Sequence, residues 1–93
     1  MHYTYVLLSG PNNRFYTGCT SDLRKRVQEH RAGRVRWTAA RQPVKRIYYE
    51  ACRNPDDAYR RERFLKSGKG KRYLRKRLAG FFLTLSQDKL ERH

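Results

Sequence analysis

The stretch Tyr3-Thr4-Tyr5-Val6-Leu7-Leu8-Ser9 is followed by Gly10-Pro11-Asn12-Asn13 and then by Arg14-Phe15-Tyr16-Thr17-Gly18-Cys19. Aromatic and β-branched residues are typical of strands, whereas Gly, Pro and Asn are typical of tight turns. The three segments therefore predict a β-hairpin over residues 3–19. The rest of the fold is expected to be built around this hairpin.

The segments after the hairpin predict helices and one further strand. Thr20-Ser21-Asp22 offers N-cap side chains for a helix through about Ala32 that ends at Gly33. A polar stretch over 34–42, a strand over 44–51, a helix over 55–67 that stops at Gly68, a basic link over 69–71, and a helix from 71 to 78 or beyond follow in that order. The order β-β-α-β-α-α predicts an α+β fold, a small three-stranded antiparallel sheet flanked by helices.

The length of the chain limits the number of domains. A chain of 93 residues can build only one small core, so we expect a single domain over 1–93. The last residues, 87–93, are expected to be frayed.

The chain is strongly basic. It has 23 Lys and Arg against 8 Asp and Glu, a formal net charge of +15. Such a field attracts polyanions, and nucleic acid is the leading candidate because cationic side chains release phosphate counterions on binding. An anionic membrane is the rival partner. The basic segments are interrupted by aromatic residues and glycines, which does not fit one amphipathic helix, so we expect no membrane partner.

The two cysteines and the absence of targeting patterns indicate the compartment. Cys19 and Cys52 have no C-x-x-C spacing, which fits a reducing compartment better than a disulfide scaffold or a zinc site. The first residues show no signal-peptide pattern, and the apolar stretch 81–85 is far too short to span a bilayer. We therefore expect a cytoplasmic protein.

Two polar residues occupy the inward stripe of the first predicted helix. Leu23 and Val27 define this stripe, and Arg26 and His30 lie on it at the i+3 and i+7 positions. One interpretation is that Arg26 extends to the rim while His30 is a satisfied structural histidine. The two residues together, beside the tyrosines of the hairpin, favour a functional site.

Glu62 occupies a similar position in the second predicted helix. It lies four residues after Ala58 and three before Leu65, on the stripe that faces the core. It is the only acid between Asp57 and Asp88. A salt bridge within a basic helix would explain it, but a lone carboxylate in a polyanion-binding protein also suits Mg²⁺ or Mn²⁺, completed by water and phosphate.

Tyr5 and Tyr16 complete the set of candidate residues. They share a face of the hairpin only if opposed residues have numbers with an odd sum, such as Leu7 opposite Tyr16. The pair could simply pack as aromatic neighbours across the strands. Gly18, on the same face, is expected to leave space beside them for a ligand.

These motifs together resemble the GIY-YIG nuclease superfamily, particularly its small stand-alone bacterial members. Tyr3-Thr4-Tyr5 and Tyr16-Thr17-Gly18 correspond to its two triplets, and the segments 21–30, 61–66 and 68–74 are similar to its later motifs. The similarity covers residues 3 to about 79, which marks the expected core of the domain. Five weak signals in the right order make the resemblance specific.

The resemblance implies hydrolysis of a phosphodiester by water with one divalent metal ion, Mg²⁺ or Mn²⁺. On that model Glu62 holds the metal, and Arg26 stabilises the charge that builds on the phosphate. Tyr5 would be the general base, with its phenol pKa lowered by cations and metal, and Tyr16 and His30 would orient it. The choice of base between Tyr5 and Tyr16 stays open.

A basic segment near the predicted last helix is expected to bind the nucleic-acid backbone. Its members are Lys66, Lys69, Lys71, Arg72, Arg75, Lys76 and Arg77. Such contacts position a substrate without reading its sequence. Trp37 and Thr38 are candidates for contact with a base or the backbone, although Trp37 could equally anchor its loop at the surface.

Two classes of function follow from these observations. The first is a metal-dependent endonuclease that acts on DNA in preference to RNA, prefers a nucleic-acid structure over a sequence, and works as a monomer or weak homodimer. The second is a non-catalytic DNA- or RNA-binding module on the same scaffold. A carboxylate that can hold a divalent cation, Glu62, in a positive cleft favours the endonuclease, because a binding module does not need it.

Overall fold

The computed structural model describes residues 1–91, and side chains up to residue 88. Its strands are β1 (His2–Ser9), β2 (Phe15–Thr20) and β3 (Val44–Cys52). Its helices are α1 (Leu23–Arg31), α2 (Arg36–Ala39), α3 (Pro55–Lys66), α4 (Gly68–Arg77) and α5 (Ala79–Glu91). The chain divides into two compact units, Met1–Arg63 and Phe64–His93. The expectation of a single domain over 1–93 stays a prediction.

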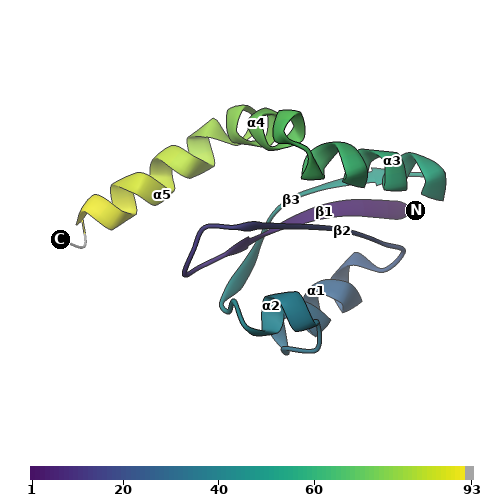
Figure 1. Ribbon diagram of the computed structural model, residues 1–93, viewed down its shortest axis with the longest axis horizontal. Coiled ribbons are helices and arrows are strands. Elements are labelled where there is room, and N and C mark those ends of the chain that lie inside the picture. Colours follow the sequence, from purple (N-terminus) through teal and green to yellow (C-terminus); the bar gives the residue numbers. More distant parts are fainter. Residues whose placement is uncertain (92–93) are drawn as a thin grey trace. The chain divides into compact units, whose positions relative to one another are not determined.

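The strands form one antiparallel sheet in the order β2-β1-β3, so β1 is central and β2 is an edge (Figure 1). Leu7 lies opposite Tyr16 and Tyr5 lies opposite Gly18, which is the register that places both tyrosines on one face. The predicted α+β class with a three-stranded antiparallel sheet is confirmed. The short helix α2 and the last helix α5 are additions to the expected order.

Different helices cover the two faces of the sheet. The core cluster on one face consists of Tyr5, Leu7, Val27 and Val44. On the other face, the Thr4 hydroxyl donates to the Ala58 carbonyl of α3 over 2.8 Å, and the Cys19 thiol donates to the same carbonyl over 3.2 Å. Because successive side chains of β1 point to opposite faces, Tyr5 faces α1 while Thr4 faces α3. Figure 1 shows α1 and α2 on one side of the sheet and α3 on the other.

Helix α1 begins and ends where the sequence predicts. The Asp22 carboxylate accepts from the Lys25 backbone N–H over 3.1 Å, which satisfies a donor of the first turn. Gly33, just beyond the helix, has a φ of 76°, a conformation that favours glycine. These two caps fix which residues of α1 face the sheet.

The junction between α3 and α4 differs from the prediction. Ser67 caps α4, because its hydroxyl oxygen accepts from the Gly70 backbone N–H over 3.1 Å and its hydroxyl donates to the Phe64 carbonyl. The predicted end of the helix near Ser67 agrees with α3, which ends at Lys66, but the predicted link over 69–71 is wrong, since α4 begins at Gly68. Glycines ordinarily indicate a linker, and a serine cap directly before them changes that outcome.

Helix α5 extends further than expected. It includes Gly80, whose carbonyl accepts from the Thr84 hydroxyl over 3.0 Å. The tail predicted to be frayed over 87–93 is helical as far as Glu91, and residues 92–93 lie outside the described residues. Within the part of the chain that the structure describes, no helix combines the length and the apolar character that a membrane span requires.

Gly70 and Gly80 provide a matched pair for testing this second unit. A Cβ at buried Gly70 would lie 2.0 Å from the Phe64 carbonyl oxygen, whereas nothing lies within 4 Å at Gly80. We expect Gly70→Ala to lower the free energy of unfolding by at least about 1–3 kcal/mol, because backbone must move. Gly80→Ala should instead raise it by about 0.5–1 kcal/mol. Urea unfolding followed by circular dichroism measures both, and equal stability of the two variants would contradict the close approach at Gly70.

Candidate active site

The Tyr5 ring lies over the Gly18 position of the edge strand. A Cβ at Gly18 would be 2.6 Å from the Tyr5 hydroxyl oxygen, so only glycine leaves room for this ring. The ring centroid of Tyr16 is 6.3 Å from that of Tyr5. The expectation that Gly18 leaves space for a ligand is wrong, because the Tyr5 phenol fills that space.

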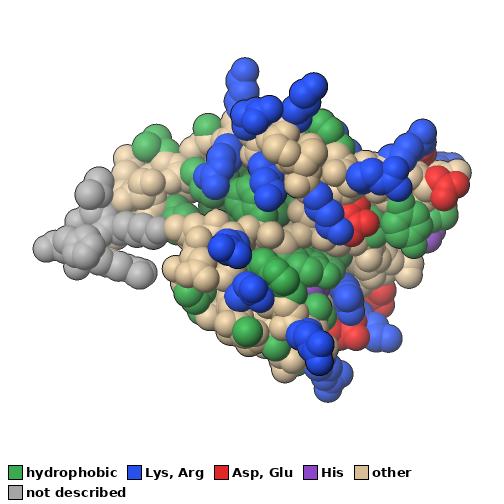
Figure 2. All heavy atoms as spheres, viewed as in Figure 1, with side chains coloured by type: hydrophobic (Ala, Val, Ile, Leu, Met, Phe, Trp, Pro, Cys, Tyr) green, Lys and Arg blue, Asp and Glu red, His purple; other side chains and the backbone are tan. Residues whose placement is uncertain are grey.

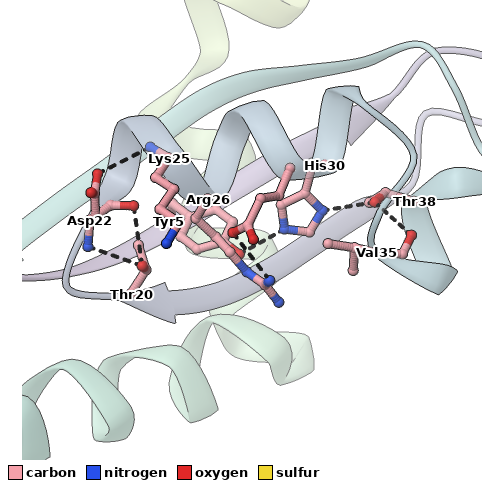
Figure 3. A network of polar contacts seen from close by, with 9 residues as sticks. Tyr5, Thr20, Asp22, Lys25, Arg26, His30, Val35 and Thr38 are labelled. Carbon is pink, nitrogen blue, oxygen red and sulfur yellow. Dashed lines mark hydrogen bonds and ion pairs between the residues drawn. The ribbon is translucent and has the colours of Figure 1, made fainter.

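His30 lies beside both tyrosines. Its side chain has 0% exposure, and its ring centroid is 5.7 Å from that of Tyr5 and 4.7 Å from that of Tyr16. Its Nε2 atom is 2.8 Å from the Tyr5 hydroxyl, and its Nδ1 atom is 2.7 Å from the Thr38 hydroxyl (Figure 3). Both ring nitrogens of this buried imidazole therefore have hydrogen-bond partners.

Thr38 fixes the tautomer of His30. The Thr38 hydroxyl has one proton, and the Val35 carbonyl at 3.3 Å can only accept it. The Nδ1–H of His30 then donates to the Thr38 oxygen, and Nε2 accepts from the Tyr5 hydroxyl. The hydrogen bonds thus run in one direction, from Tyr5 through His30 and Thr38 to Val35.

Burial keeps the phenol and the imidazole neutral. Desolvation lowers the pKa of His30 to about 4, and the Arg26 charge acts in the same direction. Desolvation also raises the pKa of Tyr5 to about 12, although its polar contact with Arg26 opposes this shift. At neutral pH the Tyr5 hydroxyl holds its proton and the imidazole is uncharged, as the direction of the hydrogen bonds requires. The expected lowering of the Tyr5 pKa is therefore absent in the protein alone.

Arg26 lies at the rim beside Tyr5 and is partly open to solvent. Its side chain is 35% exposed, and it forms an ion pair of 3.7 Å with Glu29. The polar contact with Tyr5 is the first cause that raises the pKa of Arg26 above its ordinary value. Figure 3 shows its side chain reaching from α1 toward Tyr5. Arg26 and His30 thus share one stripe of α1, with the guanidinium at the rim and the imidazole in the core.

Helix α2 carries Trp37 and Thr38 and determines what their side chains contact. The ring of Trp37 lies 5.5 Å from that of Tyr16, and the Arg41 guanidinium lies 4.2 Å from the Trp37 ring. These contacts favour an anchoring role for Trp37. The expectation that Thr38 contacts nucleic acid is wrong, because its side chain is fully buried against His30.

The part that Thr38 plays was not predicted. A threonine in a polar stretch gives no periodic signal, and only the fold of α2 brings it to His30. Gln42 strengthens this arrangement, because its amide donates to the carbonyls of His30 and Thr38 over 2.7 and 2.9 Å. These hydrogen bonds hold the loop between α1 and β3 against the backbone of His30 and Thr38.

Glu62 lies on the other face of the sheet from Tyr5. It belongs to α3, whose buried Ala58 contacts the Thr4 face. Arg61 and Glu62 lie three and four residues after Ala58, and therefore on opposite flanks of α3. Since Arg61 donates to Glu50 of β3 over 2.6 Å, its flank faces β3, and the opposite flank, which carries Glu62, is turned away from that contact.

The structure thus brings four predicted residues together on one face of the sheet, and the fifth, Glu62, belongs to the helix on the other face. Tyr5, Tyr16, Arg26 and His30 form one group on the α1 face. Glu62 belongs to α3 on the other face of the sheet, on the flank opposite Arg61. We name the strip of β2 between them the β2 edge.

The side chains available as metal ligands indicate which kind of metal ion could bind near Glu62. In the described part of the chain, no group of three or more His, Cys, Asp or Glu side chains is arranged to hold a metal ion. A single carboxylate fits Mg²⁺ or Mn²⁺ that keeps its waters and binds together with a phosphate.

The basic residues of the second unit are exposed, as backbone-binding residues must be. They are Lys66, Lys69, Lys71, Arg72, Arg75, Lys76 and Arg77. Their side chains belong to the end of α3 and to α4. Their contact with nucleic acid stays a prediction.

The motifs and this geometry can now be compared with known proteins. Residues 1–79 match the family model for the GIY-YIG catalytic domain. The chain therefore belongs to the GIY-YIG family, a nuclease family, and its substrate class is nucleic acid. The resemblance that the sequence predicts is confirmed.

Its relatives include small proteins named UPF0213. The chain is 37% identical over 67 residues to a UPF0213 protein of Clostridium perfringens (strain 13 / Type A), covering 71% of each chain. It is 36% identical over 67 residues to one of Haloquadratum walsbyi, covering 71% of this chain and 74% of that one. Among solved structures it is similar to the solution NMR structure of a UPF0213 protein from Bacillus halodurans, with 30% identity, 78% and 80% coverage and a TM-score of 0.49.

The buried imidazole predicts a pH dependence of stability. Because the folded-state pKa of His30 is lowered to about 4 from 6.5, its contribution is present above pH 6.5 and is lost as the pH falls toward 4. The loss is at most about 3 kcal/mol in the free energy of unfolding. His30→Gln should flatten the profile over this range, whereas His2→Gln should keep the parent profile. Denaturant unfolding at several pH values measures the difference, and parallel profiles for parent and His30→Gln would contradict the assignment.

Proposed function

We propose that this protein is a divalent-metal-dependent endonuclease that hydrolyses phosphodiester bonds at the β2 edge. The observation that carries the proposal is the placement of phenol, imidazole and guanidinium groups on one side of this edge and of Glu62 on the other. In this proposal a nucleic-acid backbone lying along β2 meets Arg26 from the α1 face, where the guanidinium adjoins the buried Tyr5 hydroxyl, and Glu62 from the α3 face. Within the described part of the chain β2 pairs with a strand on one side only, which supports such a path along its outer side.

Glu62 is the metal-binding residue in this proposal. Mg²⁺ in phosphate-processing sites is commonly held by one or two carboxylates together with water and substrate phosphate. The cation, when bound, polarises the phosphoryl oxygen and neutralises its charge. Glu62 therefore recruits the cation jointly with the substrate, which fits a site without a preformed cage.

Arg26 stabilises the phosphate in the transition state. Its guanidinium is held charged beside Tyr5, at a rim where an anion can reach it. A fixed donor that faces the developing negative charge is worth more at a partly desolvated rim than in water. The ion pair with Glu29 leaves the guanidinium at the surface, where phosphate can compete for it.

Tyr5 and His30 move the proton in this proposal. Tyr5 accepts a proton from the attacking water while its own hydroxyl proton passes to Nε2 of His30, the acceptor it already contacts. The phosphorus–oxygen bond to the attacking oxygen forms as the bond to the leaving oxygen breaks. With a phenol pKa of about 12, Tyr5 is not ionised at rest, so the transfer belongs to the transition state. Tyr16 packs against His30 and helps to hold its ring.

The charge of the chain supports a polyanionic substrate. Figure 2 shows Lys and Arg side chains spread over the visible face, with few acidic side chains between them. Guanidinium and ammonium groups bind phosphates of any sequence, so we propose a preference for nucleic-acid structure, with DNA favoured over RNA. The spacing of Cys19 and Cys52, which forms no C-x-x-C pair, supports a reducing, cytoplasmic setting, in which we propose that the protein acts as a monomer or weak homodimer.

A non-catalytic nucleic-acid-binding module is the second candidate. The raised pKa of Tyr5 favours it, because a binding module needs no base. The ordered hydrogen bonds from Tyr5 through His30 to Thr38 favour the enzyme, because a binding module needs no directional proton path.

Cleavage assays separate these functions. We expect the parent protein to nick branched DNA with Mg²⁺ or Mn²⁺, and Glu62→Gln and Arg26→Ala to lose at least about a hundredfold in rate while binding persists, because each removes charge stabilisation from the transition state. Binding is measured separately by fluorescence anisotropy in EDTA.

Two control variants isolate the effect. Glu50→Gln removes a carboxylate on the β3 flank of the same face, and Lys25→Ala removes an exposed cation next to Arg26 in sequence. Both should cut at close to the parent rate. Cleavage by Glu62→Gln at the parent rate would refute the metal role. Binding without cleavage of branched, single-stranded or duplex substrates under either cation would favour the binding module.

A further inference from the structure

A second basic surface lies on the flank of α1 that faces β3. Two adjoining hollows of about 380 and 280 Å³ share Arg24 and Arg46. We name them together the α1–β3 groove. The lining residues used below, all exposed or partly exposed, are Tyr3, Asp22, Arg24, Arg31, Arg46 and Tyr49. Because β3 and β2 are opposite edges of the sheet, this groove is distinct from the β2 edge.

A bulge in β3 builds the groove. Tyr49 lies opposite Tyr5 and Arg46 lies opposite Leu7, although residues three apart on a regular strand point to opposite faces. The register shift between Val6 and Leu7 adds one residue to β3 and turns Arg46 to the face that carries Tyr49. The Arg46 guanidinium consequently lies 5.0 Å from the centre of the Tyr49 ring.

The groove combines flat aromatic surface with excess positive charge. Tyr49 is 49% exposed, and its ring lies 6.2 Å from that of Tyr3. The lining contains three arginines and one carboxylate, Asp22, which is engaged in capping α1 at the Lys25 N–H. An exposed aromatic ring can stack on a planar apolar partner, and arginine side chains can form charged hydrogen bonds with phosphates.

We infer that the α1–β3 groove binds a single-stranded segment of nucleic acid, with an unpaired base on Tyr49 and the adjoining phosphates on Arg46 and Arg24. Aromatic faces interleaved with cations are how proteins hold single strands without reading sequence. A duplex does not fit as well, because its bases are stacked on one another and offer no free face. The inference rests on the proposed function only in taking the same class of polymer, and it uses none of the residues at the β2 edge.

Binding without cleavage tests the groove directly. In EDTA, fluorescence anisotropy compares an oligothymidylate of about 15 nucleotides, the same strand with abasic sites, and a duplex of equal length. We expect Tyr49→Ala to weaken binding of the oligothymidylate about tenfold, and to leave the abasic strand and the duplex unchanged. Tyr49→Phe, which keeps the aromatic face, should bind like the parent.

Matched variants separate the groove from general charge. Tyr59 is a 57% exposed tyrosine on α3, so Tyr59→Ala should leave all three ligands unchanged. Arg46→Ala should weaken the binding of both single strands and lower the salt slope of binding by about 1. Arg53→Ala, at an exposed site outside the groove, should have a smaller effect on both quantities. The inference would be overturned if Tyr49→Ala and Tyr59→Ala lost the same affinity for the oligothymidylate. It would also be overturned if Tyr49→Ala lost as much affinity for the abasic strand as for the oligothymidylate.

The outcome is independent of the cleavage experiment. Groove binding by a protein that never cuts would refute the proposed nuclease and leave this inference standing. Cleavage that depends on Glu62, with no effect of Tyr49→Ala on single strands, would refute the groove alone.

Discussion

Tyr5 and Gly18 face each other across β1 and β2, and the missing Cβ of Gly18 is what lets the Tyr5 ring lie over the edge strand. From that position the phenol reaches Nε2 of His30, and His30 in turn reaches Thr38. A slip of one residue in the pairing would send Tyr5 to the α3 face and leave the buried imidazole without its donor. The register of the hairpin therefore decides whether the polar chain through the core exists.

Helix α1 carries two sets of cations on its two flanks. Arg26 lies beside Tyr5 toward β2, whereas Arg24 and Arg31 line the groove toward β3. The Asp22 cap and Gly33 fix the length of the helix, so the angle between these flanks follows from helical geometry alone. A rigid helix can thus hold two parts of one polymer in a fixed relation, one at the β2 edge and one in the groove.

Sequence periodicity was informative where side chains alternate regularly. It predicted the hairpin and the inward placement of His30, and it stated the register that would place Tyr5 and Tyr16 on one face, because strand and helix periods decide these features. It did not predict Thr38 as the partner of His30, since that contact depends on how the loop after α1 folds. It also did not predict that Arg46 joins Tyr49, because one bulged residue reverses the alternation and leaves no trace in composition.

β2 lies at the edge of the sheet and has a strand partner on one side only in the described part of the chain. Unpaired edge strands are templates for association, and proteins limit this by short edges and by charge. β2 has six residues, and the formal net charge of +15 makes two copies repel each other at that edge. The same charge attracts a phosphate backbone, so one electrostatic field both opposes association of two copies and favours a polyanionic partner. The high charge destabilises the isolated fold through self-repulsion, and a bound polyanion offsets that cost where the edge would otherwise be bare.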